Sequence, residues 1–516
     1  KQIWALIAGY VIVWLVFSLV AAGLQIALSR AVLLNGGLVL VKNETFERVS
    51  ILVTDGIITA LLADGDGPED AKRVDVSDRL IIPGLVNGHT HSHGALGRGG
   101  VAADMTLEPF LAGSAWLNAS RSTDDLRLAA ELSAAELIRK GCTSCFDLFI
   151  ELPGPTVEGI HAVAEAYQGA GLRAVVAPMI ADKTIYQALP GLLEQFDQPL
   201  RDIVAALSIP DWQDIIAVCN EAFATWPIPD GRVRPGIGPT IPLHCSDAFL
   251  TSCADVAAQH EIPLQTHLAE TRLQQVIAHQ QYGTSLTAHL DHLQVLSPQF
   301  SGAHGVWLSQ SEADLLAAHD ACICHNPLSN LRLGSGIAPV RMLMDSGVTL
   351  GVGTDASNTS DGQCMFEAMR LAATLSRTQV SDSTEWISTR DAFAMATTGS
   401  ARIMGLKNVG MIAEGWAADM LFLDAGYCHY TPLRTPIDQI VFAENGAGLR
   451  EVMIAGEYVF ANDRVLTLDE PSLAKRAADA ATRLDETNAQ TRLMNAAASA
   501  VVQSFCRATC ALPYPN

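Results

Sequence analysis

The stretch GLVNGHTHSHG, residues 84–94, carries the clearest indication of the fold. It begins as a short apolar strand and ends in polar residues, with His89 and His91 two positions apart. Because alternate residues of an extended strand project to the same side, both imidazoles are directed toward one point. A single pair of this kind is weak evidence for a metal site, so its meaning depends on the rest of the chain.

Seven more short apolar stretches follow, and residues with helical spacing separate them. One helix is expected over residues 124–140, where Gly141 is a favourable residue after the last turn. The expected strands read GLVNGHTH, TSCFDLF, LRAVVAPMI, VRPGIGPTI, PLQTHLAE, GAHGVWLS, ACICHNPL and VTLGVGTDA. These units predict a closed (β/α)8 TIM barrel over residues 84–410, with a doubly wound open sheet as the alternative.

The sequence on either side of the barrel region is rich in β-forming residues. Before it, AVLLNGGLVLV and VSILVTDGIITALL contain Asn-Gly and Asp-Gly, which are hairpin signals. After it, MIAEGWAADMLFLDA and EVMIAGEYVFANDRV again read as hairpins. We therefore predict that residues 30–83 and 411–470 form one small β-sandwich into which the barrel is inserted. The alanine-rich residues 471–516 are expected to form a helical tail.

Residues 1–29 differ in character from the rest of the chain. Positions 3–28 are uncharged and apolar, over a length that would span a bilayer as a helix. The segment is interpreted as a membrane anchor or as an export signal with small residues at 21–23. The alternatives are a start-site artefact, since the chain begins with Lys1, or a buried helix. The catalytic part is expected in the cytoplasm, with any membrane attachment through residues 3–28.

The composition favours a folded enzyme and excludes some partners. Hydrophobic residues make up 49% of the 516 and charged residues 17%, which suits a large core and argues against disorder. The formal net charge of −22 repels nucleic acid and anionic lipid, so a small neutral or cationic substrate is expected. The eleven cysteines lack zinc-ribbon spacing and are expected to be reduced, buried thiols.

Side chains that bind metals occur at the ends of three further strands. The fifth strand ends with His267 and Glu270, the sixth carries His304, and the eighth ends with Asp355. In a barrel these strand ends meet at one rim, where such folds carry their active sites. Imidazoles and a carboxylate suit zinc or ferrous iron and leave a position for water, whose pKa the metal lowers. Glu270 is placed to carry protons without being a ligand.

Five motifs at these strand ends resemble those of the amidohydrolase superfamily: GLVNGHTHSHG, QTHLAE, GAHGVWLS, CHNPLSNLRLGSGIAPV and GVGTDASN. Over residues 31–465 the sequence is most similar to the branch with S-adenosylhomocysteine/methylthioadenosine, guanine and cytosine deaminases and triazine hydrolases. The resemblance implies a barrel inserted in a β-sandwich and one divalent metal ion, Zn2+ or alternatively Fe2+. Its implied ligands are His89, His91, His267 and Asp355.

The resemblance also implies roles for residues around the metal. Glu270 matches the family's proton shuttle, and His304 matches the histidine that contacts the bound water or the intermediate. Asp355 is expected to share in stabilising and deprotonating that intermediate. The residues expected near the substrate are Asn326, Ser329 and Asn330 on the loop after the seventh strand, and Arg98 and Trp116 after the first.

Two departures from the family bear on the metal count and the substrate. Binuclear relatives have a carboxylated lysine at the end of strand four, but here that strand has none and Lys183 follows strand three, so one metal ion is expected. The nucleoside deaminases have a histidine where this sequence has Thr240, with His244 four residues later, and the arginine of guanine deaminases is absent too. Thr240 and His244 are interpreted as substrate contacts, and the resemblance does not fix the ring.

The sequence thus predicts hydrolytic deamination of a nitrogen heterocycle of purine, pyrimidine, pterin or triazine type, with release of ammonia. Hydrolysis of a cyclic amide, or dechlorination of a triazine-like ring, is the alternative reaction. A non-catalytic, membrane-tethered binding protein is the alternative from another class. The presence of both the metal ligands and Glu270 argues against it, because an inactive site does not require both. The resemblance also implies a dimer or larger homo-oligomer.

Overall fold

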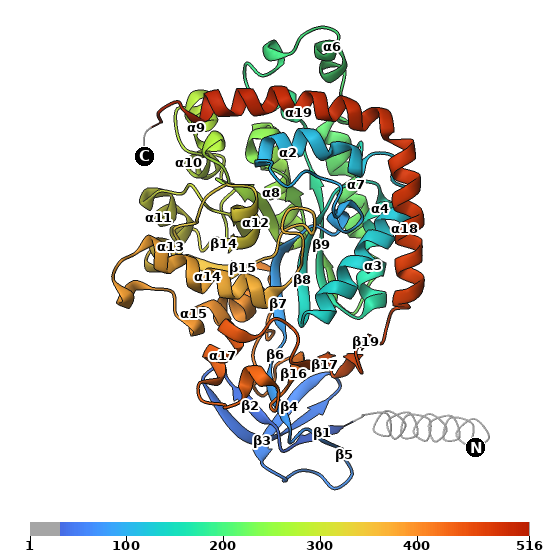
Figure 1. Ribbon diagram of the computed structural model, residues 1–516, viewed down its shortest axis with the longest axis vertical. Helices are drawn as coiled ribbons and strands as arrows, with labels where there is room; N and C mark the ends of the chain where they lie inside the picture. The colour runs from blue at the N-terminus through green and yellow to red at the C-terminus, as the bar shows by residue number, and fades with distance from the viewer. Residues whose placement is uncertain (1–30, 515–516) are drawn as a thin grey trace, which may run out of the picture.

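The computed structural model describes residues 31–514 and shows a barrel with a β-domain at one end (Figure 1). Residues 1–30 and 515–516 lie outside the described part of the chain, and so does the membrane-anchor or signal prediction for residues 3–28. Between residues 31 and 514, no helix is long and apolar enough to cross a bilayer.

Two parallel sheets close into the barrel. One contains β7 (Leu85–Thr90), β8 (Cys142–Phe149), β9 (Arg173–Ile180), β10 (Val233–Pro235) and β11 (Gly238–Pro239). The other contains β12 (Leu264–Leu268), β13 (Phe300–His304), β14 (Cys322–His325) and β15 (Thr349–Val352). A parallel bridge from Ile237 to Leu264 joins the sheets, and the Asp355 amide donates to the His89 carbonyl, 3.0 Å away, where the last strand meets the first. The prediction of a (β/α)8 barrel, rather than an open sheet, is confirmed.

The fourth barrel strand is divided into β10 and β11 at Gly236. A Cβ atom at this position would lie 2.6 Å from Val175 Cγ1 on β9, so a larger residue would push the two strands apart. Beyond β11, the Thr240 amide donates to the Ile180 carbonyl (2.8 Å), and the Thr240 carbonyl accepts from the His267 amide (2.9 Å). The division of the fourth strand therefore positions the Thr240 carbonyl at the rim, beside β12.

Apolar side chains pack on both sides of the barrel strands. Inside the barrel, Val86, Phe146, Leu148, Val175 and Cys324 belong to one buried cluster. A larger cluster packs the outside of the strands against the helices α4 (Val157–Ala170), α7 (Trp212–Ala224), α8 (Asp247–His260), α9 (Arg272–Tyr282), α10 (Leu286–His292), α11 (Gln310–Ala318), α13 (Val340–Asp345) and α14 (Met365–Gln379). Because each large apolar side chain contributes about 1.5–3 kcal/mol when buried, the strands form a rigid support for the rim.

Helix α3 (Thr123–Arg139) shows how local sequence sets the ends of an element. Ser122 and Asp125 form a capping box, in which each side chain accepts from the other residue's amide. Gly141 follows the helix with φ of 78°, a left-handed conformation that glycine adopts without strain. The helix expected over residues 124–140 is therefore present one residue earlier at each end.

Both flanks of the barrel contribute to the β-domain, as the fold prediction stated. The first flank forms β1 (Val32–Asn35), β2 (Leu38–Val41), β3 (Thr45–Thr54), β4 (Ile57–Ala63), β5 (Lys72–Asp75) and β6 (Arg79–Pro83). The second forms β16 (Met420–Asp424), β17 (Leu449–Ile454), β18 (Glu457–Ala461) and β19 (Arg464–Val465). Strands β6 and β16 pair antiparallel, and Leu34, Val39, Ile51, Ile81 and Phe422 are among the residues of their shared core.

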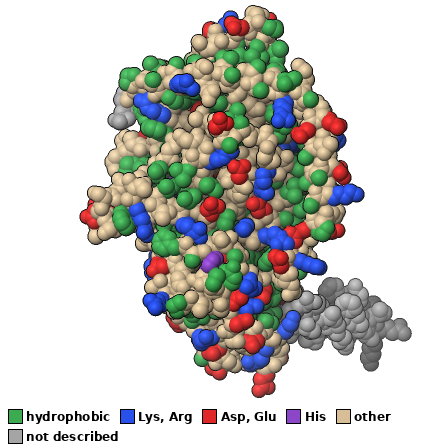
Figure 2. All heavy atoms as spheres, viewed as in Figure 1, with side chains coloured by type: hydrophobic (Ala, Val, Ile, Leu, Met, Phe, Trp, Pro, Cys, Tyr) green, Lys and Arg blue, Asp and Glu red, His purple; other side chains and the backbone are tan. Residues whose placement is uncertain are grey.

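Two helices follow the β-domain, α18 (Glu470–Thr487) and α19 (Ala489–Cys510). The chain turns between them at Asn488, whose side chain accepts from Ser120 Oγ and donates to the Ala119 carbonyl, each at 2.9 Å. Helix α19 then crosses the barrel end that carries α2 (Leu107–Ser114), as Figure 1 shows. On the face drawn in Figure 2, acidic and basic side chains are interspersed rather than separated by sign.

Candidate metal centre

The strand ends bring the six predicted catalytic and metal-binding side chains to one rim of the barrel. His89 lies near the end of β7 and His91 just after it, His267 lies in β12, His304 ends β13, and Asp355 follows β15. All are buried, with exposed fractions between 0% and 8%, and so is Glu270 at 1%. His304 and Asp355 have φ angles of 76° and 61°, which are costly for residues other than glycine and are typical of functional sites.

Each of the four histidines is held at Nδ1 by an acceptor. His91 Nδ1 lies 2.6 Å from the Leu148 carbonyl and His267 Nδ1 lies 2.5 Å from the Thr240 carbonyl. A carbonyl can only accept, so Nδ1 carries the proton in both rings. His89 Nδ1 lies 2.7 Å from Gln265 Oε1, and His304 Nδ1 lies 2.8 Å from Asn330 Oδ1. In the neutral rings the four Nε2 atoms are therefore left as acceptors.

These Nε2 atoms face one another, and this arrangement fits a divalent cation. His91 Nε2 and His267 Nε2 are 3.1 Å apart, so two lone pairs would repel unless a cation lay near both. The Nε2 atoms of His89 and His304 have no hydrogen-bond partner among the residues described. Donor atoms within 4.8 Å of one another form two overlapping groups, His89–His267–His304 and His89–His91–Asp355. Imidazole nitrogens and one carboxylate are a donor set that suits zinc or ferrous iron.

Two hydrogen bonds fix the carboxylate of Asp355 beside the histidines. Ser329 Oγ donates to Asp355 Oδ2 at 2.5 Å, and the Ala356 amide donates to Asp355 Oδ1 at 2.7 Å. Asp355 Oδ1 lies 3.6 Å from His89 Nε2 and 3.2 Å from His91 Nε2. Burial alone would raise the pKa of Asp355, but the two histidines hold it well below its usual range. Asp355 is therefore an anion at the centre of the cluster.

Glu270 lies beside the cluster with a different environment. Its amide donates to Gln274 Oε1 (2.9 Å), and its Oε2 atom lies 3.5 Å from His304 Nε2. Neither carboxyl oxygen has a hydrogen-bond partner within residues 31–514. Burial, together with the nearby carboxylates of Asp355 and Glu108, raises the pKa of Glu270 well above its usual range. A buried carboxyl group with both oxygens available is suited to hold and transfer a proton.

The residues predicted near the substrate fall into two groups. Asn326, Ser329 and Asn330 are buried at the rim, and the Nδ2 atoms of both asparagines lack an acceptor in the described part of the chain. Thr240 contributes its carbonyl to His267. His244 is half-buried in the turn after it, where burial lowers its pKa to about 4.

Arg98 and Trp116 instead make structural contacts. Arg98 pairs with Glu136 on α3 and donates to the Ser357 carbonyl (3.4 Å). Trp116 is 3% exposed beneath α19, where the Arg492 guanidinium lies 4.8 Å from its ring centroid. These contacts account for both side chains without a substrate.

Three buried polar residues at the site were not predicted, namely Gln265, Glu108 and Ser335. Gln265 lies two positions before His267 in the same strand, so the strand's alternation could have assigned it to the same face. Glu108 and Ser335 lie on a helix of the first connection and on a loop, where no periodic signal identifies them. Thr271 Oγ1 donates to Glu108 Oε1 at 2.5 Å, and Ser335 Oγ has no partner among residues 31–514.

A pocket of about 300 Å³ opens beside Glu270. Its lining includes Glu108, Thr271, Trp307 and Ser335 from the barrel end, and Gln503, Cys506, Arg507 and Cys510 from α19. Helix α19 therefore forms one wall of the space next to Glu270.

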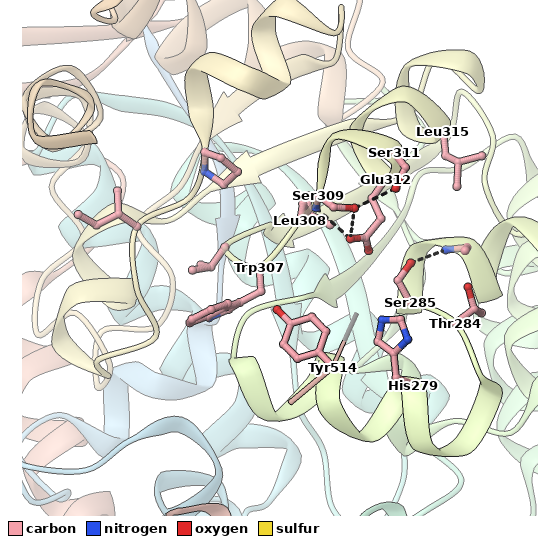
Figure 3. A pocket seen from close by; sticks show the side chains of 14 residues that line it. His279, Thr284, Ser285, Trp307, Leu308, Ser309, Ser311, Glu312, Leu315 and Tyr514 are labelled. Atoms are coloured by element: carbon pink, nitrogen blue, oxygen red, sulfur yellow. Dashed lines mark hydrogen bonds between the residues drawn. The ribbon is translucent and has the colours of Figure 1, made fainter. Parts of the chain in front are cut away.

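Trp307 also borders a larger pocket of about 490 Å³, drawn in Figure 3. There Tyr514 stacks on His279 of α9 with ring centroids 5.5 Å apart. Ser309 and Glu312 on its other side are occupied with the capping box of α11. None of the six predicted catalytic and metal-binding residues lines this pocket, so it is separate from the metal centre.

A (β/α)8 barrel with this rim of histidines, an aspartate and a buried glutamate defines a metal-dependent hydrolase. The chain belongs to the amidohydrolase family, whose model matches residues 80–459. The family prediction made from the five motifs is thereby confirmed.

Curated relatives match most of the chain. A 5'-deoxyadenosine deaminase from Methanothermobacter thermautotrophicus is 32% identical over 439 residues, covering 85% of this chain and 95% of the relative. A 5-methylthioadenosine/S-adenosylhomocysteine deaminase from Haloarcula marismortui is 31% identical over 457 residues, covering 88% and 98%.

Solved structures share the fold. An adenosine deaminase from Xanthomonas campestris with bound zinc has a TM-score of 0.78 and 26% identity, covering 88% of this chain and 98% of that one. An atrazine chlorohydrolase from Arthrobacter aurescens, complexed with zinc, has a TM-score of 0.77 at 23% identity, covering 87% and 100%. The second likeness is one of fold alone.

Proposed function

We propose that the protein is a zinc-dependent deaminase that removes the exocyclic amino group of a purine-type heterocycle and releases ammonia. One observation carries this proposal. Four unprotonated Nε2 atoms and the Asp355 carboxylate lie together, and the carboxyl group of Glu270, which has no hydrogen-bond partner among residues 31–514, lies beside them. The two curated relatives described above, 32% and 31% identical to this chain, are deaminases named for adenosine derivatives, which favours a purine over the other rings.

His89, His91, His267 and Asp355 would hold the metal ion. A divalent ion bound there would polarise a water molecule and lower its pKa toward neutrality. His304 completes the cluster on the side of Glu270, and Asn330 keeps its Nε2 atom directed inward. Ser329 donates to Asp355 Oδ2 and so fixes the orientation of the Asp355 carboxylate.

Glu270 would accept a proton from water and deliver it to the ring nitrogen beside the amino-bearing carbon, while the new carbon–oxygen bond forms. The hydroxyl proton of the resulting tetrahedral intermediate would pass through Asp355 to the amino group. The carbon–nitrogen bond then breaks and ammonia leaves. His304 Nε2 would contact the added oxygen. A placed proton carrier of this kind typically contributes about 10²–10⁴-fold to the rate.

The orientation of the ring would depend on amide groups at the rim. Asn326 and Asn330 have buried Nδ2 atoms without acceptors in the part of the chain described, and they would donate to ring heteroatoms. Thr240 and His244 lie at the neighbouring rim position, and His244 is neutral at physiological pH because burial lowers its pKa. Small, neutral substrates match the net charge of −22, which also disfavours nucleic acid as a partner.

Ammonia release tests this function. Zinc-loaded protein should release one equivalent of ammonia from 5'-deoxyadenosine or methylthioadenosine and leave the corresponding 6-oxo product. Guanine, cytosine, a pterin and an aminotriazine serve as ring controls. Chloride release from a chlorotriazine, or ring opening of a cyclic amide, without ammonia from any amino heterocycle would overturn the proposal.

A further inference from the structure

A cleft of about 420 Å³ lies at the end of the barrel opposite the metal centre, where the barrel floor meets the β-domain. Arg173, the first residue of β9, and Arg234 of β10 line one side of it. Residues 405–409, which follow α16 (Ser400–Ile403), line the other side. Ile57, at the start of β4, and Ala417 form the part that belongs to the β-domain.

The cleft is positively charged although the chain as a whole is acidic. Arg173, Arg234 and Lys407 line it, and no carboxylate is among its lining residues in the described part of the chain. Arg173 is neutralised by Asp419, which accepts from it at 2.6 and 3.2 Å. Arg234 donates to the Gly405 carbonyl (2.9 Å), and neither Arg234 nor Lys407 forms an ion pair in residues 31–514. Asp230, next to the cleft residue Gly231, pairs with Arg232 (3.3 Å). Two uncompensated positive charges therefore face one space.

The rest of the lining suits an anion that carries an organic group. The backbone amides of Lys407, Asn408 and Val409 make no hydrogen bond within the described chain, and Asn408 is in the left-handed region with φ of 56°. Successive free amides in such a loop favour anions. Ile57, Leu406, Val409 and Ala417 add apolar surface. The volume is far larger than a phosphate ion needs and lies in the range typical of small-molecule sites.

We propose that this cleft is a second ligand site, which binds a phosphorylated small molecule. Arg234 and Lys407 contact the phosphate group, since guanidinium and ammonium groups form the strongest hydrogen bonds to phosphate oxygens. The apolar residues contact the organic part. Because the cleft lies at the amino ends of the barrel strands and the metal centre at their carboxyl ends, such a ligand does not compete with a substrate for space.

Titration calorimetry on the metal-loaded protein at low ionic strength tests this site, with inorganic phosphate, phenyl phosphate and phenol as probes. Phenyl phosphate should bind more tightly than inorganic phosphate, and phenol should not bind. Arg234→Gln and Lys407→Gln should each weaken binding of phenyl phosphate about tenfold, the scale of one charge-assisted hydrogen bond. Lys475→Gln, which removes an exposed charge on α18, is the matched control and should bind as the wild type does.

Three outcomes would overturn the proposal. Unchanged affinity in both Arg234→Gln and Lys407→Gln would show that any bound phosphate lies elsewhere, including at the metal. Equal weakening by Lys475→Gln would show a general charge effect and no defined site. Inorganic phosphate binding as tightly as phenyl phosphate would restrict the ligand to the free anion and remove the organic moiety from the proposal. The calorimetric test does not measure ammonia release, so its result is independent of the deaminase proposal.

Discussion

His91 Nε2 lies 3.1 Å from His267 Nε2, while both rings are held at Nδ1 by backbone carbonyls, of Leu148 and Thr240. The carbonyls fix the tautomer, so the two Nε2 atoms present lone pairs to each other. Such a contact is repulsive between neutral rings and becomes favourable when a cation binds both nitrogens. The backbone of β8 and of the residue that follows β11 therefore fixes both histidines in the tautomer that a metal ion requires.

The first prediction is the metal content. We expect one tightly bound divalent ion per chain, because the donor atoms cluster around one point and strand four provides no bridging lysine. Elemental analysis of purified protein measures this directly. His267→Ala should lose most of the metal, whereas His279→Ala, which removes a histidine of α9 outside the cluster, should retain it. Two tightly held ions per chain would contradict the mononuclear site.

The second prediction concerns Gln265, which accepts from His89 Nδ1 at 2.7 Å and donates to the Gly88 carbonyl and Ser301 Oγ. Gln265→Leu removes the acceptor that orients the His89 ring. Metal affinity, measured by competition with a chelator, should fall about 10–100-fold, the usual effect of losing such a partner. Gln265→Glu keeps an acceptor and should recover most of the affinity. Normal metal affinity in Gln265→Leu would mean that packing alone orients His89.

The third prediction concerns Trp116, which the sequence assigned to the pocket and which packs beneath α19 against Arg492. Trp116→Ala should destabilise the protein by about 3–5 kcal/mol, as large core truncations do. The thermal midpoint of the metal-loaded protein should fall by several degrees, while KM for the identified substrate changes by less than about threefold. A large rise in KM with an unchanged thermal midpoint would instead place Trp116 in contact with the substrate.

The barrel and the rim residues could be predicted because both depend on local pattern. Short apolar strands such as 143–149 alternate with helical spacing, and polar residues at strand ends meet wherever a barrel closes. His304 and Asp355 were predicted for this reason, although their positive φ angles were not. The contacts of Arg98 could not be predicted, because its partner Glu136 lies 38 residues away on another element.

The pocket beside Glu270 was beyond prediction for the same reason. Its wall from α19, with Gln503 and Arg507, comes from the tail, and the tail was expected only to be helical. The tail is divided into two helices at Asn488, and this turn depends on hydrogen bonds to Ser120 and Ala119, which are far away in the sequence. Long-range contacts of this kind leave no periodic signal in the tail.

Glu270→Gln tests whether Glu270 carries the proton in the proposed deamination. The substitution keeps the size and hydrogen-bonding reach of the side chain but prevents it from accepting a proton from water. Glu312→Gln, at an equally buried carboxyl group on α11 away from the rim, is the matched control. We measure metal content and the rate of ammonia release for both.

Glu270→Gln should keep one metal ion per chain while turnover falls by about 10² or more. Glu312→Gln should keep both metal and turnover near the wild-type values. Near-normal turnover in Glu270→Gln, with its metal retained, would show that another group moves the proton and would contradict the mechanism.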